Sequence, residues 1–141
     1  MTVLALRDFS AHDRNPAPVD GHIAEVTVFT DMAAVEPHWR ALEQTCVLAT
    51  PYQQHDFLKL WQRHVGAVRG VSPFIVVGFN PYGTPLFLWP LGLRHVAGLR
   101  VVEFLGGKHA NFHMALWRSE VASQLQAGDL KAVLDRLGAD A

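Results

Sequence analysis

The chain has 141 residues, about the size of one domain, and half of them are hydrophobic while 18% are charged. A chain this apolar can bury enough surface to offset the entropy of ordering it, so the composition excludes intrinsic disorder. Twelve Lys and Arg residues stand against 13 Asp and Glu residues, which gives a formal net charge of −1. Because no basic excess is available to neutralise phosphates, we expect no nucleic-acid partner.

The single cysteine, Cys46, excludes an intramolecular disulfide framework and a zinc site built from several cysteines. The longest apolar run, around Pro85 to Leu93, is interrupted by Pro90 and is too short to span a bilayer. The N-terminus carries charges among its apolar residues and lacks the pattern of a secretory signal. We therefore expect a cytoplasmic protein without a transmembrane segment.

Residues 1–21 are expected to form a flexible leader, because the stretch from Ser10 to Gly21 is polar and rich in proline. The folded part, residues 22–141, opens with the β-branched run from His22 to Thr30, which predicts a first strand.

A first helix follows, with Asp31 as its expected N-cap and an end near Thr45. Pro37 is tolerated only in the first turn of a helix, so the helix either begins near Glu36 or is bent there. The apolar residues that recur at helical spacing are Val35, Trp39, Leu42 and Cys46.

The second helix is predicted from its N-terminal capping residues. Thr50, Pro51 and Gln53 match an N-cap, a proline at the first helical position and the Gln of a capping box, and Gly66 is a plausible stop. One apolar face is expected to comprise Phe57, Leu60, Trp61, His64 and Val65.

Three antiparallel strands are predicted next. They are Phe74 to Phe79, Leu86 to Leu93 and Leu99 to Leu105, separated by turns at residues 80–83 and 97–98. The continuous apolarity of the second of them indicates that both of its faces are covered. Pro90 cannot donate to a strand ladder, so it marks either a bulge or a free edge position.

The rest of the chain predicts a loop, a short apolar segment and a final helix. Gly106 and Gly107 end the last strand, a polar loop leads into Phe112 to Trp117, and Ser119 to Leu137 has roughly helical spacing weakened by Gly128. The predicted order is β-α-α-β-β-β-α, which is an α/β (α+β) class with a mixed, mostly antiparallel sheet flanked by helices.

Few residues suggest chemistry by spacing alone. His109 and His113 would share a helix face, but they lack a third ligand and follow a Gly pair, so we expect no metal site. Cys46 is expected to be a buried, inert thiol rather than a nucleophile. Gly106-Gly107-Lys108 lacks the rest of a phosphate-binding loop, and a Gly pair ending a strand is the simpler interpretation.

The tryptophans divide in the same way. Trp39 and Trp61 are expected to pack in the core, whereas Trp89, beside Pro90, is a candidate for a ligand cleft.

Several short motifs nevertheless occur in a specific order. They are Trp39-x-x-Leu42, Thr50-Pro51-Tyr52-Gln53, Phe57-Leu58-x-x-Trp61, Trp89-Pro90-Leu91, Phe104-Leu105-Gly106-Gly107 and Asn111-Phe112. Together they resemble the N-terminal part of the GNAT-like acetyltransferase family associated with cellulose biosynthesis, the CelD/BcsL type, over roughly Val26 to Trp117.

The resemblance implies a complete enzyme that transfers an acyl group from acetyl-CoA or another acyl-CoA to an amine or hydroxyl, linked to the cell envelope or a polysaccharide. The family's pyrophosphate loop, Arg/Gln-x-x-Gly-x-Gly/Ala, has no match after the Leu99 to Leu105 strand. We therefore expect an incomplete, N-terminal GNAT-like half-domain that is inactive alone. It would bind no cofactor itself, and its partner would be a missing C-terminal half or another chain.

No catalytic residue can be carried over from the resemblance. The candidates for binding the acceptor are Tyr52, Gln53, Trp89, Lys108, His109 and Asn111. Their alternative roles are helix capping for Gln53 and loop hydrogen bonding for the others. A different interpretation of the whole chain is a non-enzymatic module that binds a partner through an open sheet edge.

Overall fold

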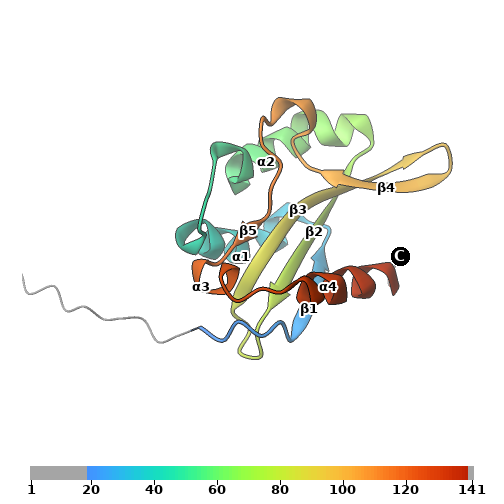
Figure 1. Ribbon diagram of the computed structural model, residues 1–141. Coiled ribbons are helices and arrows are strands. Elements are labelled where there is room, and N and C mark those ends of the chain that lie inside the picture. Colours follow the sequence, from blue (N-terminus) through green and yellow to red (C-terminus); the bar gives the residue numbers. More distant parts are fainter. Residues whose placement is uncertain (1–18, 140–141) are drawn as a thin grey trace, which may run out of the picture.

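The computed structural model describes residues 19–139, so most of the expected leader lies outside the described residues. The described part forms an antiparallel sheet with helices on both faces (Figure 1). Its strands and helices are β1 (Glu25–Phe29), α1 (Met32–Thr45), α2 (His55–Trp61), β2 (Ser72–Phe79), β3 (Pro85–Val96), β4 (Leu99–Phe104), β5 (Leu116–Trp117), α3 (Ser119–Ala122) and α4 (Ala127–Ala139). The predicted class is confirmed, with β5 and α3 as additions.

The strands lie in the order β1-β2-β3-β4, and each pairing is antiparallel. One edge of β3 pairs with β4 from Leu91 onward and with β5 at Phe87 and Leu88. Pro90 lies between these two pairings, where its carbonyl accepts a hydrogen bond from Leu105 N at 2.9 Å. Because proline has no N–H, this gap between the two pairings tolerates it. Neither predicted alternative holds in full, since Pro90 pairs with Ile75 inside the sheet and the register irregularity of this strand pair lies at Gly78 and Phe79.

Two apolar clusters form on opposite faces of the sheet. β2 shows the alternation directly, since Ile75 and Val77 face one cluster and Val76 faces the other. The first cluster is completed by α1 and α2, and the second by α4 and residues near Val19 and Ile23. Both faces of the central strands are therefore covered, as their continuous apolarity predicts.

α1 begins earlier than one of the predicted alternatives. Asp31 caps it by accepting a hydrogen bond from Ala33 N at 2.8 Å, which confirms the predicted cap. The helix then starts at Met32 and continues through Pro37, so a start near Glu36 is wrong. The cap alone, at about 1 kcal/mol, does not offset the roughly 3 kcal/mol cost of an interior proline, so the burial of Val35, Trp39 and Leu42 must also stabilise the helix.

The second helical segment is interrupted and longer than predicted. The Thr50 capping box forms, but it caps the short 3₁₀ turn η1 (Pro51–Gln53), and α2 starts separately at His55. Beyond α2, a π-helical turn and a 3₁₀ turn carry the chain past Gly66 to Gly70, which has a left-handed φ of 71°. The predicted stop at Gly66 is therefore wrong.

The predicted apolar face of this helix is also partly wrong. Leu60 is 57% exposed, while the buried positions of α2 are His55, Leu58 and Trp61. His55 is buried because its ring has a hydrogen-bond partner on α1, a tertiary contact that periodicity cannot reveal.

The tail forms two helices instead of one. α3 is a single turn at Ser119–Ala122, and α4 begins at Ala127, so Gly128 lies at the start of a helix rather than in the middle of one. Of the helices in residues 19–139, none has the length and apolarity needed to cross a bilayer.

Gly78 permits the closest packing in the sheet. It pairs with Phe87 of β3, and a Cβ added at Gly78 would lie 2.0 Å from Phe87 Cε1. The aromatic ring therefore occupies the space that any other residue would need.

We expect Gly78→Ala to destabilise the protein by about 1–3 kcal/mol, because the methyl group forces the buried Phe87 ring out of place. Chemical denaturation measures the change. Gly128→Ala is the matched control, since nothing lies within 4 Å of its added Cβ. Equal stability of the two variants would contradict this account of the packing.

Candidate functional site

The loop after β4 folds back over the start of the second helical segment. Three hydrogen bonds join this loop to that segment. Gln53 Nε2 donates to Phe112 O at 2.8 Å, and Asn111 Nδ2 donates to the Tyr52 hydroxyl at 3.0 Å. Trp61 Nε1 donates to His109 Nδ1 at 3.2 Å. We call Tyr52, Gln53, Trp61, His109 and Asn111 the loop platform.

Gln53 is the buried anchor of the loop platform. Its side chain is 1% exposed, and Oε1 accepts hydrogen bonds from Thr50 N at 3.1 Å and Thr50 Oγ1 at 2.6 Å. The Gln53 carbonyl accepts another from Trp39 Nε1 at 2.8 Å. Capping, predicted as the alternative role of Gln53, is therefore present together with a tertiary role in holding the loop.

The structure brings four of the six predicted acceptor residues into the loop platform: Tyr52, Gln53, His109 and Asn111. Lys108 lies next to it on the 3₁₀ turn η4 (Gly107–His109). Trp89 is on the opposite face of the sheet, with its ring centroid 5.4 Å from that of Phe87. It therefore cannot share a ligand with the platform, whose anchors belong to the α2 side.

A recess of about 270 Å³ lies beside the platform. Its lining is Trp61, Arg69, Val71, Arg94, Glu103, Gly107 and Lys108. Arg94 Nε is 3.0 Å from Glu103 Oε1, in an ion pair that is not aligned as a hydrogen bond. Arg69 and Lys108 form no ion pair within the described residues, so the recess has an excess of positive charge.

His109 presents a donor rather than an acceptor to solvent. An indole N–H can only donate, so Nδ1 of His109 is the nitrogen that accepts and Nε2 carries the hydrogen in the neutral ring. His113 is held separately, with Nε2 2.9 Å from Gly107 O and its ring stacked on Phe104. The two imidazoles therefore do not share the single helix face that a metal pair would need.

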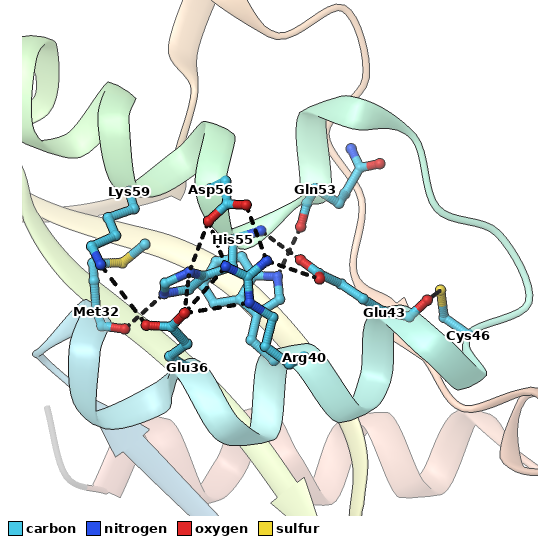
Figure 2. A network of polar contacts seen from close by, with 10 residues as sticks. Met32, Glu36, Arg40, Glu43, Cys46, Gln53, His55, Asp56 and Lys59 are labelled. Carbon is cyan, nitrogen blue, oxygen red and sulfur yellow. Dashed lines mark hydrogen bonds and ion pairs between the residues drawn. The ribbon is translucent and has the colours of Figure 1, made fainter.

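A second polar cluster joins α1 to α2 (Figure 2). Arg40 contacts three carboxylates: Nη2 lies 3.1 Å from Glu36 Oε1 and 2.5 Å from Asp56 Oδ1, and Nη1 lies 3.3 Å from Glu43 Oε2. The other Glu43 oxygen accepts from the backbone N of His55 at 2.6 Å. This network fixes the start of α2 against α1.

The network shifts two ionisation equilibria. The hydrogen bond to Asp56 raises the pKa of Arg40, and Glu36 and Glu43 add smaller increases. Desolvation lowers this pKa, but by less than the carboxylates raise it. The hydrogen bond from Arg40 holds the pKa of Asp56 below its ordinary value near 3.8. Asp56 is exposed, so solvent screens the pair, and the network is better described as orienting than as strongly stabilising.

His55 is the buried member of the second cluster. Its Nε2 is 2.8 Å from Met32 O, so Nε2–H donates, and Nδ1 has no hydrogen-bond partner. Glu36 and Asp56 lie 3.7 and 4.0 Å from Nδ1. These three side chains could offer ligand atoms to a metal ion, but the Arg40 guanidinium already occupies both carboxylates, which makes the cluster structural.

Cys46 ends α1 and is half-buried against the first apolar cluster. Burial raises the pKa of its thiol above the ordinary value of 9.0. A thiol that stays protonated is a poor nucleophile, which supports the interpretation of Cys46 as inert.

Comparisons of the chain with protein-family models, curated proteins and solved structures found no match.

Two features of the site were not predicted from the sequence. The α1 half of the ion-pair network had a usable signal, because Glu36, Arg40 and Glu43 are spaced i, i+4 and i, i+3 on a helix. The positive recess beside the loop platform had no such signal, because Arg69 and Arg94 come from segments far apart in the sequence.

We expect Gln53→Ala to lower the free energy of unfolding by about 1–3 kcal/mol, because the half-buried Thr50 cap and the Phe112 carbonyl lose their hydrogen-bond partner. Gln54→Ala is the matched control, since Gln54 is exposed and its side chain makes no capping hydrogen bond. Chemical denaturation compares the two, and a control that is equally destabilised would contradict the anchoring role.

Asp56→Asn tests the network by its pH dependence. The pKa of Asp56 is lower in the folded than in the unfolded state, so its stabilisation is complete above the ordinary value near 3.8 and is lost as pH falls through the folded value. Urea denaturation at neutral pH should show the variant less stable than the parent, with the difference vanishing in acid. A difference that persists below the folded pKa would show that the charge is not its cause. Asp135→Asn removes only a surface pair with Lys131 and serves as the control.

Proposed function

We propose that this chain is the N-terminal portion of a GNAT-type acyltransferase and that the loop platform forms part of its acceptor site. The acceptor would be an amine or hydroxyl compound linked to a polysaccharide or the cell envelope, and the donor acetyl-CoA or another acyl-CoA. The remaining cofactor-binding part would come from a C-terminal half or a partner chain, in the cytoplasm.

The observation that supports the proposal is the convergence of separate motifs. Several of the motifs that carry the family resemblance meet here: Thr50-Pro51-Tyr52-Gln53, Trp61, Gly106-Gly107 and Asn111-Phe112. Hydrogen bonds between residues 59 positions apart join the first of them to the last. The Trp89-Pro90-Leu91 motif is not among those that meet, since Trp89 lies on the opposite face of the sheet. Motifs that meet in space are what a shared binding site requires, whereas packing motifs need no exposed polar groups.

The platform offers outward polar groups on a buried support. Asn111 and His109 are exposed and Tyr52 is half-buried, while Gln53 and Trp61 beneath them are buried. The Tyr52 hydroxyl and His109 Nε2–H can each donate to an acceptor oxygen, and the Asn111 amide can donate or accept. Such groups can orient a hydroxyl or amine but do not supply a general base.

In the complete enzyme the acceptor nitrogen or oxygen would attack the thioester carbonyl. A new amide or ester bond forms, the carbon–sulfur bond breaks, CoA leaves as the thiol, and a general base takes the acceptor's proton. The role left to the described residues is orientation of the acceptor.

The alternative, a partner-binding module, also has an observation in its favour. β4 pairs with β3 along one edge, and its other edge pairs with no strand in residues 19–139. Leu99 is 69% exposed and Val102 47% exposed, as on a strand that could accept an added strand.

Titration of the isotope-labelled chain with glucosamine and with cellobiose, followed by NMR, tests the proposal. We expect saturable shifts at the loop platform for one of the two sugars, weakened at least about fivefold in Tyr52→Phe and Asn111→Ala, since each removes one hydrogen bond to the ligand. Tyr82→Phe is the matched control, because Tyr82 is 81% exposed in the β2–β3 turn.

Calorimetry with acetyl-CoA separates the hypotheses further. Micromolar binding by this chain would overturn the claim that its cofactor site lies elsewhere. Absence of sugar binding, combined with downstream DNA that encodes no Arg/Gln-x-x-Gly-x-Gly/Ala segment, would favour the partner-binding module.

A further inference from the structure

The sheet face opposite the loop platform is incompletely covered. α4 packs over Val76 and Phe87, but a cavity of about 300 Å³ lies beyond it, between α4 and β4. Its lining is Val26, Val28, Phe74, Leu93, Arg100, Val102, Arg136 and Leu137, which we call the α4–β4 recess. Four strands and one helix contribute to it, so all of its lining residues belong to regular secondary structure.

The lining of the α4–β4 recess is mostly hydrocarbon. Six of its residues are Val, Leu or Phe, and five of these are half-buried while Val102 is 47% exposed. Its volume is at the small end of the range of about 300–1,000 Å³ for small-molecule sites. Covering such a surface removes apolar area from water, which is the main favourable contribution to binding.

The two polar residues of the recess are both arginines. Arg100 comes from β4 and Arg136 from α4, and neither forms an ion pair or a side-chain hydrogen bond within residues 19–139. The recess contains no acidic residue. Glu103 pairs with Arg94 and Asp135 with Lys131, while Asp129, which lines a neighbouring cavity together with Arg136, accepts a hydrogen bond from Gln126 N at 3.0 Å. Guanidinium groups are always charged, and they bind carboxylates in a bidentate geometry.

We propose that the α4–β4 recess binds a medium-chain fatty carboxylate, with its hydrocarbon chain against the apolar wall and its carboxylate between Arg100 and Arg136. An apolar body with one anionic end is the ligand chemistry that matches six apolar residues and two arginines that have no ion-pair partner in residues 19–139. The proposal does not rest on the proposed function, because the recess and the loop platform lie on opposite faces of the sheet.

Calorimetry with hexanoate, octanoate and decanoate tests the proposal on the whole chain. Each added methylene buried in the recess should tighten Kd roughly threefold to fourfold. Decanol, which has no charge, should bind at least about threefold more weakly than decanoate, and Arg100→Gln and Arg136→Gln should each weaken decanoate by about threefold to fivefold. Saturable binding that lacks this dependence on chain length or on the arginines would overturn the proposal.

Val102→Glu places a carboxylate in the recess and should abolish decanoate binding. Leu99→Glu is the matched control, because Leu99 is 69% exposed on the same strand but does not line the recess. Thermal unfolding verifies that both variants fold. Decanoate binding that survives in Val102→Glu, or is lost equally in Leu99→Glu, would exclude this site.

Two further measurements identify other occupants. Flotation with vesicles of phosphatidylglycerol and phosphatidylcholine shows whether the anion belongs to a lipid surface, and binding to vesicles without binding to monomeric decanoate overturns the proposal.

Light scattering measures the oligomeric state. A dimer that Val102→Glu dissociates would show that a second copy covers this face, which also overturns it.

Discussion

The burial of β2 and β3 on both faces is the constraint on which the rest of the structure depends. Ile75, Val76 and Val77 follow one another in the chain and have no exposed surface, although successive side chains point to opposite faces. Neither face can be left in water, so the chain must cover both. α1 and α2 cover one face closely, with Trp39 and Leu42 fully buried. α4 covers only part of the other face, and the α4–β4 recess is the part that it leaves open.

Pro90 determines where the loop platform can form. β3 cannot donate a hydrogen bond at this residue, and β4 and β5 pair with the strand on either side of it along the same edge. The connection between β4 and β5 must therefore leave the sheet next to Pro90, where Leu105 N bonds to its carbonyl. The polar residues of this connection then need partners outside the strand ladder. The partners of this connection lie on η1 and on α2, where Gln53 and Trp61 donate hydrogen bonds to it, and these contacts form the loop platform.

Local signals in the sequence predicted local structure well. The Asp31 cap, the Thr50 capping box and the turn at Ala97 and Gly98 all form, because each depends on residues within a few positions of one another. The burial of His55 and the ion pair of Arg40 with Asp56 could not be predicted, since both need α1 and α2 to be packed first. The family resemblance likewise did not predict on which face of the sheet each motif residue lies. Trp89 belongs to β3, and the register of this strand places its side chain on the face opposite the loop platform.

A continuous series of hydrogen bonds connects the core to the platform. Trp39 has no exposed surface, its indole N–H holds the Gln53 carbonyl, and the Gln53 amide holds Phe112 O. The support of the platform is thus fixed by the same cluster that covers the sheet, while Tyr52 and Asn111 extend from it toward solvent. Binding groups are held most accurately when their supports are locked by packing and by further hydrogen bonds. The loop platform therefore differs from the α1–α2 ion-pair network. In that network Arg40 and its three carboxylates bind one another, so few of their polar atoms are free to bind a ligand.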